Sequence, residues 1–210
     1  TFEGRIGDGS KHVGVFPEQE PHWRFVAETA KAHGVRTGNA RLLNLFGYTG
    51  AASLVAAAMG FHVTHVDASK PAIAWGRHNQ DLSGLQEAPI RWILEDAFKY
   101  CQRELRRGSR YHAILLDPPS YGRGPRGELW KVEERLPDLL DICRKLLDDK
   151  PLCVVLTLYS VEASALAAGN LLGDAMHGLG GQITLGELAL PHEGAPARLL
   201  PLSLWARWSA

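Results

Sequence analysis

Two short segments carry the residue types that could hold a ligand and act on it. Residues 42–50 read Leu-Leu-Asn-Leu-Phe-Gly-Tyr-Thr-Gly, and residues 114–121 read Ile-Leu-Leu-Asp-Pro-Pro-Ser-Tyr. Each is an apolar run that ends abruptly in small, polar or ring residues, which is typical of a buried parallel strand that delivers a loop to the carboxyl edge of a sheet. Ligands of open α/β sheets bind outside those ends. The two segments therefore predict one ligand beside one reaction centre.

The first segment predicts a nucleotide-like ligand. Its loop, Gly47-Tyr48-Thr49-Gly50, follows the strand and precedes a helix, so backbone N–H groups and the helix dipole face the ligand. Gly47 and Gly50 permit a close approach of the backbone. The loop lacks the three glycines that a pyrophosphate requires in the G-x-G-x-x-G pattern. This difference favours an adenosine without phosphates over a dinucleotide.

Two acids end the next two predicted strands. Asp67 comes seventeen positions after Gly50, within the window in which an acid meets ribose hydroxyls in Rossmann folds. Asp96 follows the third strand in the sequence Glu95-Asp96-Ala97, where it can accept a hydrogen bond from the adenine amino group. An aspartate directly before a helix is also a common helix cap, and that alternative stays open for Asp96.

Alternating strands and helices must position these residues. We expect strands over residues 42–46, 61–66, 90–94, 111–116 and 152–157, and helices over residues 21–32, 50–59, 70–82, 97–107, 133–147 and 160–176. Two further strands, residues 182–190 and 200–208, are joined by a connection over 191–196 that is too short for a crossover helix, so they pair antiparallel. The predicted fold is α/β: a doubly wound Rossmann-like sheet, mostly parallel, with an antiparallel hairpin at its C-terminal edge.

Composition is that of a single globular domain. Residues 1–38 should form an N-terminal flap or hairpin, with turns over 4–14 and a helix, within the same domain as residues 39–210. Formal net charge is zero, so any basic surface must be local. Three cysteines, widely spaced, favour reduced thiols and a cytoplasmic setting. We expect no membrane span and no metal site. The chain opens at Thr1, which leaves room for a preceding segment, and the sequence does not specify an oligomeric state.

Three motifs together carry a family resemblance. Asn44-Leu-Phe-Gly-Tyr-Thr-Gly50, Asp67-Ala-Ser-Lys70 and Asp117-Pro-Pro-Ser120 resemble the class I S-adenosylmethionine-dependent methyltransferases, in the branch that methylates large-subunit ribosomal RNA. The resemblance implies S-adenosyl-L-methionine as cofactor, with its methionine end at residues 44–50, its ribose at Asp67 and its adenine at Asp96. Residues 14–19 resemble the family's N-terminal flap, although an ordinary turn is an equal alternative. The implied cofactor contacts are Phe16, Gln19, Asn44, Phe46, Gly47, Tyr48, Thr49, Gly50, Asp67, Ala68, Ser69, Asp96 and Ala97.

The second segment indicates the chemistry. An exocyclic aromatic amine is a poor nucleophile, and the Asp117 carboxylate with the Pro118 carbonyl could hold its N–H groups toward a methyl donor. Tyr121 could stack on the base, as aromatic side chains do on splayed RNA bases. The alternative is a rigid loop with an aspartate cap. Methylation of cytosine carbon-5 needs a cysteine nucleophile, which follows the fifth strand in related enzymes. Thr157-Leu-Tyr-Ser160 contains none, and Cys153 should face the core.

The sequence therefore predicts a methyltransferase acting on RNA, with an amino group, or another nucleophile that needs no covalent help, favoured over cytosine carbon-5. A protein or small-molecule acceptor, or a non-catalytic cofactor-binding factor in ribosome assembly, remains an alternative. Two basic segments could contact RNA. One is Gly122-Arg-Gly-Pro-Arg-Gly127, expected as a mobile clamp or lid. The other is the group Arg103, Arg106, Arg107 and Arg110, which a solvated helix end explains equally well.

Overall fold

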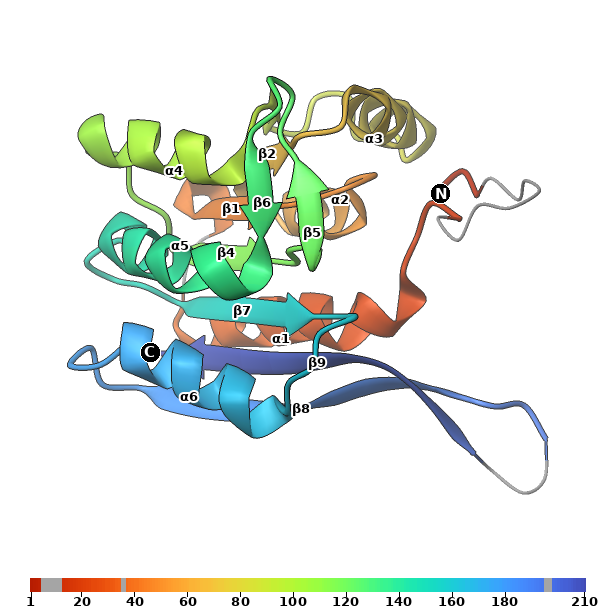
Figure 1. Ribbon diagram of the computed structural model, residues 1–210. Coiled ribbons are helices and arrows are strands. Elements are labelled where there is room, and N and C mark those ends of the chain that lie inside the picture. Colours follow the sequence, from red (N-terminus) through yellow and green to blue (C-terminus); the bar gives the residue numbers. More distant parts are fainter. Residues whose placement is uncertain (5–12, 35–36, 195–197) are drawn as a thin grey trace.

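The computed structural model describes residues 1–4, 13–34, 37–194 and 198–210, and its centre is a seven-stranded sheet (Figure 1). The strand order is β3-β2-β1-β4-β7-β9-β8, in which the first five strands are parallel and β9 and β8 are antiparallel. The strands are β1 (Arg41–Leu45), β2 (His62–Asp67), β3 (Ile90–Leu94), β4 (Ala113–Leu116), β7 (Cys153–Leu158), β8 (Gln182–Pro191) and β9 (Leu199–Ser209).

The parallel part of this strand order contains one reversal. The chain runs outward from β1 to β3, returns to β4 on the other side of β1, and continues outward to β7. The loops after β1 and β4 therefore leave the sheet side by side, and the Asp117 N–H donates a hydrogen bond to the Leu45 carbonyl at 3.4 Å. Such a switch point is where open α/β sheets bind their ligands. The predicted doubly wound sheet with an antiparallel edge hairpin is confirmed.

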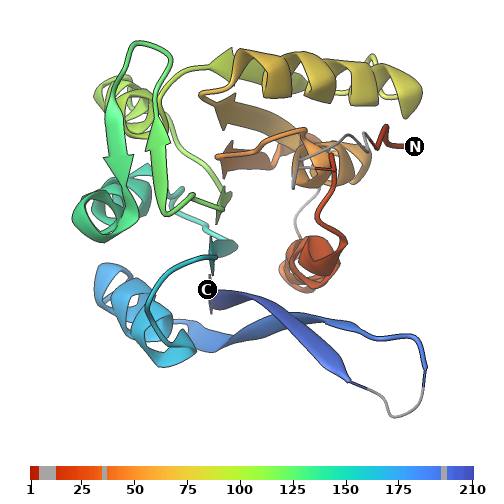
Figure 2. The ribbon, with the colours of Figure 1, turned by 45° about the vertical axis from the view of Figure 1, so that its right-hand side comes forward.

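In the described residues, six α-helices cover the two faces of the sheet. Figure 2 shows α4, α5 and α6 on one side and α1, α2 and α3 on the other. Three of the helices begin at a side-chain cap, because Ser69, Asp96 and Ser164 each accept a hydrogen bond from the backbone N–H three residues later. The helices are α1 (Glu20–Ala32), α2 (Ala51–Ala58), α3 (Lys70–Leu82), α4 (Ala97–Arg106), α5 (Val132–Leu146) and α6 (Ala165–Ala175), with short 3₁₀ turns at Pro17–Gln19 and Thr37–Asn39.

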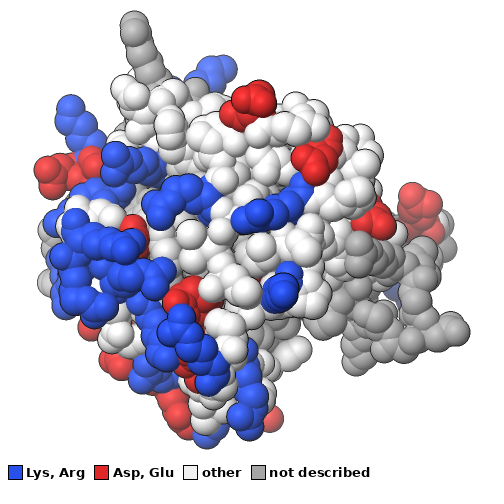
Figure 3. All heavy atoms as spheres, turned by 90° about the horizontal axis from the view of Figure 1, so that it is seen from above, with Lys and Arg blue, Asp and Glu red and all other residues white. Residues whose placement is uncertain are grey.

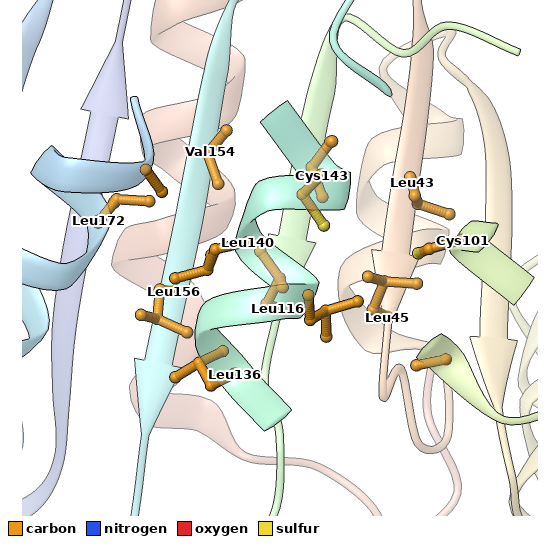
Figure 4. Packing of buried hydrophobic residues seen from close by; sticks show 14 of the residues in the cluster. Leu43, Leu45, Cys101, Leu116, Leu136, Leu140, Cys143, Val154, Leu156 and Leu172 are labelled. Carbon is orange, nitrogen blue, oxygen red and sulfur yellow. The ribbon is translucent and has the colours of Figure 1, made fainter. Parts of the chain in front are cut away.

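The larger hydrophobic core lies between the sheet and α4, α5 and α6. Figure 4 shows α5 lying across it, with Leu136 and Leu140 directed at the side chains of β1, β4 and β7. Leu139, Leu140 and Cys143 of this helix are fully buried. A second core on the opposite face packs α1 and α2 against β1, β2, β4 and β7. No helix of the described residues has both the length and the apolar character that crossing a membrane requires.

Three local predictions differ from the structure. No strands are expected directly after Tyr121, but the structure has a hairpin of β5 (Tyr121–Arg123) and β6 (Leu129–Lys131) there, because Trp130 is buried against Phe46 and its indole N–H donates to the Pro119 carbonyl at 2.7 Å. Helix α6 begins at its Ser164 cap rather than at residue 160. Strand β4 begins two residues late, since Tyr111 forms only an isolated bridge. Most of the turns expected over residues 4–14 fall outside the described residues.

The burial of α5 predicts how much its core side chains stabilise the protein. Leu140→Ala removes a fully buried side chain and should lower the free energy of unfolding by about 2–5 kcal/mol, since it leaves a cavity. Leu166→Ala in α6, where the leucine is 66% exposed, is the matched control and should change it by less than about 0.5 kcal/mol. Urea unfolding measures both; equal losses in the two variants would contradict this assignment of the core.

Candidate functional site

A cleft opens at the carboxyl ends of β1, β4 and β7. Its internal volume is about 60 Å³, well below the roughly 300–1,000 Å³ of pockets that enclose a whole drug-sized ligand. The loop after β1 forms one wall, the residues after β4 form another, and the segment before α1 covers it. Its lining includes the predicted contacts Phe16, Gln19, Asn44, Phe46, Gly47, Tyr48, Thr49 and Asp117.

The loop after β1 needs its glycines. A Cβ atom at Gly47 would collide with the His65 ring, and one at Gly50 would lie 2.6 Å from the Trp92 ring. Gly50 also has a φ of 85°, in the left-handed region that glycine adopts freely. Phe46 and Tyr48 share that region with φ values of 58° and 52°. Since each non-glycine residue there costs about 1–3 kcal/mol, neighbouring contacts must hold this loop in place.

Buried polar groups support the loop from below. The Asn44 amide donates to the Ser53 hydroxyl, and that hydroxyl lies 2.9 Å from His65 Nδ1. Burial lowers the pKa of His65 to about 3, so its ring is neutral and can accept this hydrogen bond. Asn44 thus faces the cleft from a side chain fixed on β1.

Asp67 ties the loop to β2. Its Oδ2 accepts the Tyr48 N–H and its Oδ1 accepts the Ser69 N–H, both at 2.8 Å. Burial raises the pKa of this carboxyl, and the two N–H groups act against that rise. Each carboxylate oxygen has a second lone pair. Asp67 can therefore hold the loop and still accept hydrogen bonds from ligand hydroxyls.

A second cavity lies beside the cleft, and Phe46 lines both. Asp67, Ala68, Ser69, Asp96 and Ala97 line it, together with Pro119 and Arg123 of the loop and hairpin after β4. The structure confirms Asp96 as the cap of α4, because its Oδ1 accepts the Lys99 N–H at 2.9 Å. Asp96 also lines the cavity wall, so it could accept a hydrogen bond from an adenine amino group as well; this second role stays a prediction.

Asp117 is the most perturbed acid of the site. Its Oδ1 is enclosed and has no hydrogen-bond partner among the described residues, while its Oδ2 accepts a long 3.5 Å contact from the Gln19 amide. Burial, with a smaller contribution from the negative charge of Glu18, raises the pKa of Asp117 to about 7. An enclosed acceptor facing a cleft is available for a ligand N–H, and a pKa near neutrality suits proton exchange.

The segment before α1 closes the cleft. The Thr49 hydroxyl donates to the Gly14 carbonyl, and the Phe16 ring lies 5.6 Å from the Tyr48 ring, measured between centroids. The Gln19 amide reaches Asp117 at 3.5 Å. Residues of this segment therefore line the cleft, and their role as a flap over a bound ligand stays a prediction.

Three predicted residues, Gly50, Pro118 and Tyr121, line neither cavity. Tyr121 begins β5 with 53% of its surface exposed and lines neither cavity, and Pro118 is buried. Residues that the sequence did not single out also line the two cavities, among them His22 and Trp23 in the first and Trp130 in the second. Hydrophobic periodicity predicts helix α1, but it does not show that the first turn of this helix lies beside β7. Only the tertiary packing brings the two together.

All three thiols lie in the core. Cys101 of α4 and Cys143 of α5 are buried in the larger core (Figure 4). Cys153 of β7 is buried in the second core. Burial raises the pKa of Cys153 to about 12, so this thiol is not a nucleophile at neutral pH. Among the described residues, no three His, Cys, Asp or Glu side chains are grouped as a metal site would require.

The family described as S-adenosylmethionine-dependent methyltransferase matches residues 6–159. A crystal structure of an S-adenosylmethionine-dependent methyltransferase from Agrobacterium tumefaciens is 50% identical, with a TM-score of 0.93 over 99% of this chain and 66% of that one. A protein solved in complex with S-adenosylhomocysteine shares the fold, with 21% identity and a TM-score of 0.70, over 99% of this chain and 53% of the other.

Curated relatives carry a more specific name. Ribosomal RNA large subunit methyltransferase K of Neisseria meningitidis is 32% identical over 57% of this chain and 32% of its own length. Ribosomal RNA large subunit methyltransferase K/L of Pseudoalteromonas translucida is 34% identical over 64% of this chain and 18% of its own length. The matched region is thus about a third or less of the length of these relatives.

The raised pKa of Asp117 predicts a pH-dependent cost in stability. Between its unfolded pKa of 3.8 and its folded pKa of about 7, the folded state binds the proton more tightly, so stability falls as pH rises through this window. Asp117→Asn removes that loss and should be more stable than the wild type above pH 7, by on the order of 2–4 kcal/mol. The gain should disappear near pH 4. Urea unfolding across pH measures it, and a pH-independent difference would contradict the assignment.

Proposed function

The chain belongs to the family of S-adenosylmethionine-dependent methyltransferases, and we propose that it methylates a base of ribosomal RNA at a nitrogen atom. The observation that supports nitrogen as the methyl acceptor is the enclosed Oδ1 of Asp117, directly after β4 and beside the cleft, which has no hydrogen-bond partner in the part of the chain that the structure describes. The relatives named as large-subunit ribosomal RNA methyltransferases support the substrate class. An exocyclic amino group is the nitrogen that this site is best suited to hold.

The two cavities suit the two ends of the cofactor. We assign the adenosine to the cavity of Asp67 and Asp96, where carboxylates can accept hydrogen bonds from the ribose hydroxyls and the adenine amino group. The methionine end then belongs in the cleft lined by Asn44, Gly47 and the flap. Ala68, Ser69 and Ala97 would form the wall on the adenosine side, and Phe46 would separate the two ends.

The cofactor supplies a methyl group on a positively charged sulfur. Transfer breaks the sulfur–carbon bond, whose electron pair stays on sulfur, and forms a carbon–nitrogen bond to the base, while the amine gives up one proton. The Asp117 carboxylate and the Pro118 carbonyl would hold the amine in line for this step, which is catalysis by positioning. A carboxyl with a pKa of about 7 can also accept the released proton near neutral pH.

The buried thiols support a direct transfer. Methylation of a pyrimidine carbon requires a nucleophile that first adds to the ring, and Cys101, Cys143 and Cys153 all lie in the hydrophobic core. Tyr121, exposed at the start of β5 next to the Asp117 loop, would stack on the base only once RNA is bound. Reduced thiols also fit the cytoplasmic setting that we infer for an enzyme of this substrate.

The proposal is tested with purified protein and methyl-labelled cofactor. Deproteinised large-subunit RNA, total protein and a metabolite extract are offered separately, and labelled RNA is digested to nucleosides to locate the methyl group. We expect label in the RNA, on a base nitrogen. Label confined to protein or to metabolites would overturn the RNA substrate, and label on a ring carbon would overturn the nitrogen acceptor.

Asp67 should govern cofactor affinity. Asp67→Ala removes an acceptor for the ribose hydroxyls and the tie to the Tyr48 N–H, so binding of S-adenosylmethionine should weaken by about 1.5–3 kcal/mol. Calorimetry measures this, and Asp138→Ala on the exposed face of α5 is the matched control. Unchanged affinity in the Asp67 variant would rule out its ribose role.

Asp117 should govern turnover instead. Asp117→Ala should leave the affinity for S-adenosylhomocysteine nearly intact and slow single-turnover methyl transfer by about 10²-fold or more, because one positioned contact to the reacting group is lost. Cys153→Ser should stay within a few-fold of wild type, since no thiol adduct forms. The reverse pattern, with transfer abolished by Cys153→Ser and preserved by Asp117→Ala, would replace the nitrogen mechanism by covalent carbon methylation.

A further inference from the structure

We propose that the RNA backbone lies on a continuous basic surface that runs from the hairpin β5–β6 along α4 to its carboxyl end. This inference rests on the proposed function, since it assigns the docking surface of the same substrate. We call it the α4 surface, and it consists of Lys99, Arg103, Arg106, Arg107, Arg110, Arg123 and Arg126.

Buried acids hold these cations in place. Arg103 and Arg126 both pair with Glu95, at 3.2 and 3.5 Å; the Glu95 side chain is 7% exposed, against 34% and 71% for the two arginines. Arg107 pairs with Glu104 at 3.0 Å, and there the exposed fractions are 58% and 3%. In each pair the acid lies beneath and the cation faces solvent. The surface therefore presents positive charge even though its members are paired.

Ion pairs elsewhere are built differently. Glu20 and Arg24 on α1 are 48% and 66% exposed, so both charges of that pair meet solvent and offset each other there. A guanidinium that binds a buried carboxylate through one nitrogen still has further N–H donors for a phosphate. Buried acids under exposed arginines thus favour an anionic ligand, and they reduce the side-chain entropy that the arginines would lose on binding it.

The surface is continuous and reaches the site. Lys99 of α4 contacts Glu128 of the hairpin at 2.5 Å, and Glu95 joins α4 to the hairpin through its two arginines. Lys99, Arg103 and Arg106 are four and three residues apart, on one face of the helix. At the other end Arg123 lines the cavity of Asp67 and Asp96. Figure 3 shows Lys and Arg gathered on the side where Figure 1 places α4 and extending toward the hairpin.

The gathering of basic residues on one face of the protein favours a polyanion as the ligand of the α4 surface. The whole chain has 23 basic and 23 acidic residues, so a long basic strip on one face is not a consequence of composition. Arginine predominates in it, and its planar group binds phosphate oxygens in pairs. A strip that leads from the cavity wall along α4 fits an extended chain of phosphates whose target base enters the cleft.

The test compares two triple variants of equal charge change. Arg106→Gln, Arg110→Gln and Arg126→Gln together remove exposed cations of the α4 surface, and Glu95 keeps Arg103 as partner. Arg24→Gln, Lys31→Gln and Arg198→Gln together remove exposed cations on α1 and beside β9 as the control. The affinity for a fluorescent oligouridine is measured across a series of NaCl concentrations, and calorimetry measures cofactor affinity in both proteins.

We expect the α4 triple variant to bind oligouridine roughly tenfold or more weakly at low salt, with the slope of log affinity against log salt reduced by about 2, since three cations at about 0.7 each are lost. Cofactor affinity should stay at the wild-type value, and the control triple variant should bind RNA as the wild type does. Equal losses in the two triple variants, no loss in either, or no salt-dependent RNA binding by the wild type would each overturn the proposal.

The same proteins separate this proposal from the proposed function. If the wild type transfers label to ribosomal RNA while both triple variants bind oligouridine equally well, the α4 surface is wrong and the function stands. If the wild type labels only protein or metabolites, the function itself is wrong, whatever the variants bind.

Discussion

The hydrogen bond from the Tyr48 N–H to the Asp67 carboxylate joins the ends of β1 and β2, and the shape of the site depends on it. Phe46 and Tyr48 adopt left-handed backbone angles that are unfavourable in isolation. A hydrogen bond to a charged carboxylate is among the stronger ones that a backbone can make, and this partly buried one offsets part of that cost. Gly47 lies so close to His65 that no side chain would fit. These contacts fix the loop where it borders the cleft.

A second set of contacts couples the two halves of the site. The Trp130 indole donates to the Pro119 carbonyl and packs against Phe46, so the hairpin after β4 fixes the loop of Asp117 against the loop after β1. The ion pairs of Glu95 and Lys99 bind the same hairpin to the start of α4. The β5–β6 hairpin therefore stabilises both the loop on the cofactor side of the site and the loop on the acceptor side. Its buried tryptophan explains why a glycine-rich segment folds there.

The distribution of charge follows from the burial of acids. Glu95 and Glu104 are nearly inaccessible. Two arginines reach in from the surface to Glu95, and one arginine reaches Glu104, which also accepts hydrogen bonds from the Ser109 and Tyr111 hydroxyls. A buried carboxylate without a partner is costly, so these pairs are needed for folding as well as for the surface that they create. A neutral chain can in this way present a strongly basic face. The net charge of the sequence alone gives no sign of it.

The sequence by itself determined the order of strands and helices and the positions of Asn44, Asp67, Asp96 and Asp117 at strand ends, because hydrophobic periodicity and glycine placement are local signals. Tertiary structure decided what those signals cannot encode. The hairpin after β4 depends on the burial of Trp130, and the raised pKa of Asp117 depends on its enclosure by Gln19 and its neighbours. Burial and charge compensation arise between residues far apart in the chain, and only packing brings those residues together.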